Sequence, residues 1–409
     1  MGGNWLKVAI PLALCAALPG FAEAAGRSTV TFRDADSRDR IYYFATGNND
    51  HLVVNYWDGY GWYWADQGLP PGATAISHPS AITYKDTAAK QRIYVFAYAK
   101  IGTATNLVVN YWDGSQWHWA NHGGDLQALV EPTAVTYVDG PIRRTSVFVQ
   151  RSDGHLGVNY WNGLSWVWAD RGLPAGGFAV SPLDAVTYAD GDQRIYVFCR
   201  VAGPLFPKPT LVVNRWDGND WQWIVLGGAG GGDVWQASAI TYFDESLGHQ
   251  RIYVFSTGTI STHSLWVTYF DGSWRFKDLG LPPGSQPLRG PVSAISYVDE
   301  QAIRRIQVFV SHKVFSYEDC CPFGLYLWYT DGSGPHWADR GRPQPQWSGS
   351  LWPQVLKIDA ITYRDRSGNQ WFHAFGLLDV SYGSYYLVRN YSGGAPVSLP
   401  SWANHGPLP

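Results

Sequence analysis

Short segments of alternating apolar and polar residues recur along the whole chain, and each is bounded by Gly, Asp or Pro. Four of them stand between residues 81 and 120, at Ala81–Tyr84, Arg92–Phe96, Leu107–Trp112 and Trp117–Ala120. All four are rich in β-branched and aromatic residues and too short for helices, which is typical of β-strands. No segment shows convincing helical periodicity, so the pattern predicts an all-β protein.

The third of these segments reads Leu-Val-Val-Asn-Tyr-Trp-Asp-Gly and recurs along the chain. Its seven strong or weak copies end at Gly59, Gly114, Gly163, Gly218, Gly272, Gly332 and Gly394. The spacings are 55, 49, 55, 54, 60 and 62 residues, so a unit of about 56 residues repeats seven times. Seven units of four strands predict a seven-bladed β-propeller that occupies residues 26–409 as a single domain.

Each unit contains the four strands of one blade, in order from the first to the fourth, from the mature N-terminus to the C-terminus. We therefore expect the ring to close by packing blade 7 against blade 1, with no strand exchanged.

In four units the last strand opens with two tryptophans two residues apart, which places both on one face of the sheet. We expect these pairs in the core between blades: Trp62/Trp64, Trp117/Trp119, Trp166/Trp168 and Trp221/Trp223.

The N-terminus has the pattern of an export signal, with Lys7, an apolar run over residues 8–18 and small residues around Ala24. We predict that residues 1–25 are a signal peptide and that the mature chain is secreted or periplasmic. No later stretch approaches the ~20 apolar residues of a membrane-spanning helix, so no membrane insertion is expected. In that compartment Cys320 and Cys321 could form a vicinal disulfide or remain free thiols, and they could form a rigid lip over a pocket.

Aromatic residues make up 16% of the chain and charged residues only 15%, with a net charge of -3 and no Lys/Arg runs. This composition disfavours a nucleic-acid partner. We found no acid pair, nucleophile–base set, metal-ligand spacing or dinucleotide fingerprint, so we predict no catalytic residues, no metal and no cofactor. Among the histidines, His122 and His405 occupy matching positions, and we expect them to be exposed strand residues.

Asp and Arg flank the loop between the first and second strands of the units. The Asp residues are Asp34, Asp86, Asp139, Asp190, Asp244, Asp299 and Asp365. The Arg residues are Arg40, Arg92, Arg144, Arg194, Arg251 and Arg305, with Trp371 in the seventh unit. The simpler interpretation is an ion pair that braces the hairpin. The alternative is that these arginines donate to ligand oxygens in grooves between blades.

An Asn occupies one position of the third strand in five units: Asn55, Asn110, Asn159, Asn214 and Asn390. Its amide could bind sugar hydroxyls or satisfy backbone groups at a strand end. Antiparallel pairing of the second and third strands predicts that Arg40 and Asn55 are near neighbours. Together with a tryptophan face, these groups suit a small polyhydroxylated ligand and predict one site per blade cleft.

The unit resembles the repeat of fucose-binding β-propeller lectins, both the fungal Aleuria type and the bacterial Photorhabdus type. In the Aleuria type the sugar lies between blades, held by an Arg that opens the second strand, a Glu on the third strand and a Trp or Tyr. The resemblance implies an arginine role for Arg40, Arg92, Arg194 and Arg251. It places Asn55, Asn110 and Asn214 where the family has Glu, and Trp62, Trp117 and Trp221 near its aromatic residue. A neutral amide in place of Glu leaves the identity of the sugar open.

The sequence thus favours a secreted lectin with glycans or glycoconjugates as partners, acting through several weak sites. A polysaccharide lyase or glycosidase remains an alternative, because the active residues of a propeller enzyme can come from separate blades. A protein-interaction scaffold is a second alternative. The sequence leaves the oligomeric state open, a homo-oligomer included.

Overall fold

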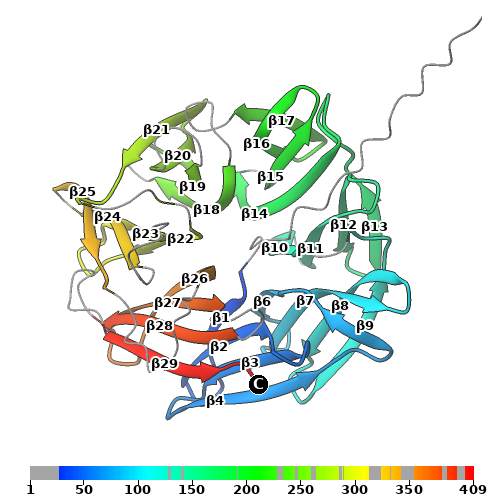
Figure 1. Ribbon diagram of the computed structural model, residues 1–409. Helices are drawn as coiled ribbons and strands as arrows, with labels where there is room; N and C mark the ends of the chain where they lie inside the picture. The colour runs from blue at the N-terminus through cyan, green and yellow to red at the C-terminus, as the bar shows by residue number, and fades with distance from the viewer. Residues whose placement is uncertain are drawn as a thin grey trace, which may run out of the picture.

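A computed structural model shows that the strands form seven sheets arranged in a ring (Figure 1). It describes residues 27–127, 130–139, 142–190, 192–227, 234–244, 247–258, 264–284, 288, 290–312, 324–331, 333–341, 354–379, 385–393 and 401–409. The prediction of a seven-bladed β-propeller is confirmed, and within these ranges there is no helix. Accordingly, no described helix is long and apolar enough to cross a membrane. The predicted signal peptide and the pair Cys320 and Cys321 lie outside these ranges.

The strands of the first four blades follow in chain order. Blade 1 holds β1 (Thr29–Arg33), β2 (Asp39–Thr46), β3 (Leu52–Trp57) and β4 (Trp62–Gly68). Blade 2 holds β5 (Ala73–Ile76), β6 (Ser80–Lys85), β7 (Gln91–Ile101), β8 (Ala104–Trp112) and β9 (Trp117–Gly123), with β5 and β6 both paired to β7 as a divided first strand. Blade 3 holds β10 (Thr133–Asp139), β11 (Ile142–Gln150), β12 (Leu156–Trp161) and β13 (Trp166–Asp170). Blade 4 holds β14 (Ala179–Asp190), β15 (Asp192–Gly203), β16 (Phe206–Trp216) and β17 (Trp221–Gly227).

The remaining three blades repeat this order. Blade 5 holds β18 (Val234–Asp244), β19 (His249–Gly258), β20 (Leu265–Phe270) and β21 (Trp274–Gly280). Blade 6 holds β22 (Val292–Val298), β23 (Arg304–His312), β24 (Gly324–Asp331) and β25 (Gly334–Asp339). Blade 7 holds β26 (Gln354–Arg364), β27 (Gln370–Asp379), β28 (Tyr385–Gly393) and β29 (Ser401–Pro407).

Every sheet is an antiparallel meander made from one repeat unit. The first strand of each blade lies nearest the ring centre and contacts the first strands of both neighbouring blades (Figure 1). At the closure, β26 of blade 7 contacts β1 of blade 1. The expectation that the ring closes without an exchanged strand is therefore confirmed.

The apolar core lies between the blades. Among the described residues, seven clusters of buried side chains each join two neighbouring blades. One cluster, for example, packs Tyr43 of blade 1 against Phe375 of blade 7, with ring centroids 5.2 Å apart. All four predicted tryptophan pairs pack against such clusters, which confirms their expected role. Cys199 is buried as a free thiol between blades 3 and 4.

A recurring hydrogen bond also links the blades. The second tryptophan of the last strand, or the single Trp402 in blade 7, donates from Nε1 to a backbone carbonyl of the preceding blade. The five bonds are Trp64 to His405 (2.9 Å), Trp119 to Gln67 (3.1 Å), Trp168 to His122 (2.9 Å), Trp223 to Arg171 (3.0 Å) and Trp402 to Arg340 (2.9 Å). The residue whose carbonyl accepts this bond is called the linker residue below. Its side chain faces the next blade.

Buried polar side chains line the ring centre and bond from blade to blade. Asp184 accepts from the Ala239 amide at 2.8 Å, and Ser293 accepts from the Ala360 amide at 2.9 Å. A buried ion pair joins Lys357 Nζ of blade 7 to Glu131 Oε2 before blade 3, at 3.0 Å. These groups hold blades together across the ring.

Candidate functional site

The arginine that opens the second strand braces its own blade. In blades 1 and 2, Arg40 pairs with Asp34 and Arg92 with Asp86, each at 2.7 Å. Their Nη1 atoms also donate to the carbonyls of Asp58 and Asp113 in the turn before the last strand. Corresponding ion pairs join Arg144 to Asp139 (2.8 Å), Arg251 to Asp244 (3.3 Å) and Arg305 to Asp299 (2.6 Å). The bracing interpretation is confirmed for these residues, and Arg194 occupies the equivalent place opposite Tyr188.

The expectation that Arg40 and Asn55 are near neighbours is wrong. The register pairs Tyr43 with Asn55 and Ile41 with Trp57, so Arg40 lies three residues from the partner of Asn55. Because side chains alternate along a strand, that odd offset turns the two side chains to opposite faces of the blade. Asn55 therefore faces blade 7 and Arg40 faces blade 2.

A cleft between two blades consequently combines an arginine from one blade with an asparagine and a tryptophan from the next. By this rule Arg40 shares a cleft with Asn110 and Trp117. Asn214 and Trp221 share theirs with Arg144, which the resemblance did not single out. The counterpart of Arg40 in the cleft that holds Asn55 and Trp62 is Trp371.

The predicted asparagines lie deep in the structure. Asn55, Asn110 and Asn214 are each only 1% exposed, and their Oδ1 atoms are buried without a hydrogen-bond partner. On the other side of the amide, Nδ2 of Asn55 and Asn110 lies 3.4 Å from a carbonyl of the same blade's last strand. These amides contribute to the floor beneath a cleft and not to its open surface.

Between blades 2 and 3 and between blades 6 and 7, the linker residue of one blade pairs with the asparagine of the next. His122 Nδ1 lies 2.7 Å from Asn159 Oδ1, and Arg340 Nε donates to Asn390 Oδ1 at 3.0 Å. The expectation that His122 and His405 are exposed is wrong, because both are half-buried between blades and burial lowers the pKa of each. Blades 4 and 5 have the apolar Leu226 and Leu279 at the equivalent position, and the blade that follows each of them has no asparagine on its third strand.

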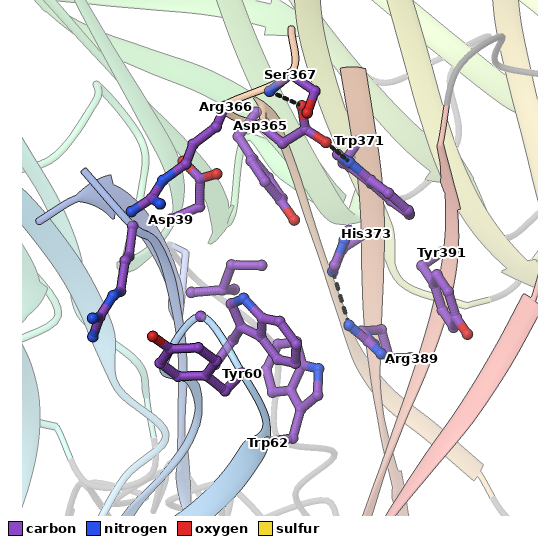
Figure 2. A pocket seen from close by; sticks show the side chains of 15 residues that line it. Asp39, Tyr60, Trp62, Asp365, Arg366, Ser367, Trp371, His373, Arg389 and Tyr391 are labelled. Carbon is purple, nitrogen blue, oxygen red and sulfur yellow. Dashed lines mark hydrogen bonds between the residues drawn. The ribbon is translucent and has the colours of Figure 1, made fainter. Parts of the chain in front are cut away.

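A cleft of about 430 Å³ opens between blades 7 and 1 (Figure 2). Blade 1 contributes residues from β2, β3 and the turn before β4, and blade 7 contributes residues from β26, β27 and β28. The lining is Arg38, Asp39, Ile41, Trp57, Gly59, Tyr60, Trp62, Tyr363, Asp365, Arg366, Ser367, Trp371, His373, Arg389 and Tyr391. Trp62 is the predicted site residue that lines it.

Two substitutions within the repeat make the wall of this cleft more polar than the equivalent wall between blades 1 and 2. Between blades 1 and 2, the rings of Phe32, Tyr42 and Tyr56 stack across the blade face at centroid distances of 5.5 and 5.6 Å. In blade 7 the smaller His373 takes the place of Tyr42, and Arg389 takes the place of a valine. A polar wall thus replaces part of an aromatic one.

Trp371 replaces the bracing arginine in this cleft. Its Nε1 donates to Asp365 Oδ2 at 2.9 Å, so the carboxylate of the loop remains bonded. Burial opposes ionisation of Asp365, but the hydrogen bonds from Trp371 and Asn369 outweigh it and lower the pKa of that carboxyl. The exchange leaves an indole ring at the cleft instead of a cation.

Arg389 is a charged residue at a position where blade 1 has the buried Val54. Its guanidinium carbon lies 4.3 Å from the Trp62 ring centroid and 4.4 Å from that of Tyr391. Nη1 lies 3.3 Å from His373 Nδ1, whereas Nε has no hydrogen-bond partner. Burial, followed by the nearby charge of Arg389, holds the pKa of His373 well below its ordinary value, so this imidazole is neutral and can accept from Nη1.

The described residues also contain a group with the composition of a metal site, on the outer part of blade 3. Asp153, His155 and Asp170 place their ligand atoms within 4.8 Å of one another. They bond locally, with His155 Nδ1 2.9 Å from Asp170 and Arg151 paired to Asp153 at 3.2 Å. Blade 1 has the same contact between His51 and Asp66, so we interpret the group as a surface ion-pair cluster.

A scan of protein-family models finds no match to this sequence, and a search of curated proteins finds none either. Solved structures do match the fold. The BP39L lectin from Burkholderia pseudomallei aligns with a TM-score of 0.63 and 16% identity, over 94% of this chain and 99% of that chain. A mutant of the Aleuria aurantia lectin, solved with Fucα1-6GlcNAc, aligns with a TM-score of 0.50 and 17% identity, over 80% of this chain and 99% of that chain. The resemblance to β-propeller lectins seen in the sequence is confirmed at the level of the fold.

Proposed function

We propose that this chain is a carbohydrate-binding protein whose sites lie in the clefts between blades. The observation that carries the proposal is the cleft between blades 7 and 1. Its volume of about 430 Å³ falls in the usual range for small-ligand sites. Trp62, Trp371 and Tyr60 offer flat rings for the apolar face of a sugar, and Arg389 offers hydrogen-bond donors.

The fold likeness supports this assignment. Both lectins named above align with this fold over most of their length, and one of them was solved with Fucα1-6GlcNAc. Sites in the remaining clefts would combine residues of two blades, such as Arg40 with Asn110 and Trp117. Several such sites on one ring would give avidity for a glycan-coated surface. The signal pattern of residues 1–25 supports export of the protein to reach such a surface.

The experiment is a glycan array probed with the chain from residue 26 onward, with and without free monosaccharide competitors. We expect specific binding that a competitor removes. Tyr60→Ala tests the cleft, because Tyr60 lines it and is 72% exposed, so that folding should be unaffected. Leu164→Ala is the matched control, since Leu164 occupies the same turn position in blade 3, is 89% exposed and offers no aromatic ring to a sugar.

Weaker binding of an array-selected glycan by Tyr60→Ala, with normal binding by Leu164→Ala, would support the cleft as a sugar site. A blank array with correctly folded protein would contradict sugar binding altogether. If both variants bind the glycan as tightly as the parent protein does, the sugar site does not lie in the cleft between blades 7 and 1.

A further inference from the structure

Arg389 departs from the repeat at a position that is otherwise apolar. It immediately precedes the third-strand asparagine and pairs with Phe375, as Val54 pairs with Phe44 in blade 1. The other five blades have Val109, Val158, Val213, Val267 and Leu327 at this position. An arginine therefore stands where six blades bury an aliphatic side chain.

This arginine is buried without an anion. It is only 8% exposed, and within the described ranges no carboxylate pairs with it. Burial lowers its pKa to about 10, which still leaves the guanidinium charged at neutral pH. By contrast, the buried Lys357 has Glu131 at 3.0 Å. An unpaired buried charge is costly, and a bound anion would remove that cost.

The side chains that contact Arg389 supply no negative charge. His373, which accepts from Nη1, is held neutral by burial, and burial also lowers the pKa of His405 to about 3. The cleft carboxylates are already engaged: Asp39 pairs with Arg33 at 3.1 Å, and Asp365 accepts from Trp371. Arg389 thus brings to the cleft wall a positive charge with no carboxylate partner among the described residues, and a donor, Nε, with no acceptor.

The same wall carries rings as well as charge. Figure 2 shows Arg389 beside Trp62 and Tyr391, with Trp371 close by. Arginine recognises carboxylates through its planar donor fork, and aromatic faces suit the apolar side of a pyranose. The size of the cleft exceeds what an inorganic ion requires.

We propose that the cleft between blades 7 and 1 is selective for an acidic saccharide, and that Arg389 receives the carboxylate of a uronic acid residue. The proposal rests on the proposed carbohydrate-binding function and adds the chemical class of the ligand. Arg389 is a selectivity residue on the third strand, distinct from the arginines that open the second strands.

The test is a calorimetric titration of the full mature chain with four probes. These are methyl glucuronide, its methyl ester, methyl glucoside and methyl glucoside 6-sulfate. We expect the glucuronide to bind about tenfold more tightly than the ester or the glucoside, as a charge-assisted hydrogen bond implies. Arg389→Met should abolish this preference, whereas Arg389→Lys should retain part of it.

Two controls keep the result interpretable. Arg389→Met should fold, because valine occupies the equivalent position in blade 1, and a thermal melt checks this. Arg275→Met removes an arginine whose side chain is 59% exposed on blade 5, so it should leave the preference unchanged. A loss of preference in both variants would assign the effect to net charge and overturn the role of Arg389.

The remaining outcomes separate the two proposals. Equal affinity for glucuronide, ester and glucoside, in both the parent protein and Arg389→Met, would overturn acid selectivity and leave sugar binding intact. Tighter binding of the sulfate than of the glucuronide would overturn the carboxylate assignment. The absence of any saccharide binding, on the array and in titration, would overturn the proposed function together with this inference.

Discussion

The indole of Trp64 and the backbone carbonyl of His405 join the first and last blades of the ring. Trp64 Nε1 donates to the carbonyl at 2.9 Å, and the same bond recurs at four interior interfaces at 2.9 to 3.1 Å. Ring closure therefore uses the contact that joins consecutive blades, without a strand exchanged between the chain ends.

This equivalence predicts the cost of removing the bond. Trp64→Phe keeps an aromatic ring but leaves the His405 carbonyl without its donor, which should lower the free energy of unfolding by about 1–3 kcal/mol. Trp119→Phe removes the corresponding bond at an interior interface and should cost a similar amount. Urea denaturation of both variants provides the measurement. A negligible loss for Trp64→Phe beside a clear loss for Trp119→Phe would show that closure does not depend on this bond.

His405 should make stability depend on pH. Burial, with a smaller contribution from Arg389, holds its pKa at about 3, whereas an unfolded histidine titrates near 6.5. Below pH ~6.5 the unfolded chain binds a proton that the folded chain does not, so the free energy of unfolding falls as pH is lowered toward about 3. The slope from this group is at most about 1.4 kcal/mol per pH unit.

Gln67 occupies the position of His405 in blade 1, so His405→Gln is the natural variant for this test. It should flatten the pH dependence of stability between pH ~6.5 and ~5. Urea midpoints measured across this interval check the expectation. Parallel curves for the variant and the parent protein would contradict it.

The pair His122 and Asn159 should be energetically coupled. Asn159→Thr leaves His122 Nδ1 without its partner at 2.7 Å and should cost about 1–3 kcal/mol. The double variant His122→Leu with Asn159→Thr reproduces the combination Leu226 and Thr268 found between blades 4 and 5, and it should recover much of that loss. A double-mutant cycle measures the coupling, and strictly additive losses would argue against it.

A single substitution in the buried pair Lys357 and Glu131 should lower the free energy of unfolding more than a double substitution does. Lys357→Met leaves the Glu131 carboxylate buried without its cation, at a cost of about 3–5 kcal/mol. Lys357→Met combined with Glu131→Gln removes both charges and should be less destabilising than Lys357→Met alone. Thermal and urea unfolding measure the stability of the two variants. A double variant that is less stable than Lys357→Met alone would contradict the expectation.

The repeat made the fold predictable from the sequence. Seven copies of one unit indicated seven blades, and the spacing of Trp62 and Trp64 placed both on one buried face. The bracing role of Arg40 was also accessible, because Asp34 and Arg40 flank one short loop. These features depend on contacts within a unit or on strand periodicity, which a sequence displays directly.

Contacts between units were harder to predict. The offset between Arg40 and Asn55 depends on strand register, which hairpin length sets and the repeat motif does not reveal. His122 packs against Trp166 and bonds to Asn159, and both belong to the next unit. The sequence nonetheless contains a signal for this contact between units. Leu226 and Leu279 take the place of His122 in units 4 and 5, and the unit that follows each of them lacks the third-strand asparagine. Arg389 was likewise visible as a charged residue at a valine position, within one of the weaker copies of the repeat.

The most direct test of sugar binding between blades is a crystal structure of the chain with the saccharide that binds most strongly on the array. We expect the sugar in the cleft between blades 7 and 1, in contact with Trp62 and Trp371. Further copies between other blades would support repeated sites. An empty cleft, with the saccharide bound only at the ring centre or on the outer strands, would contradict the account.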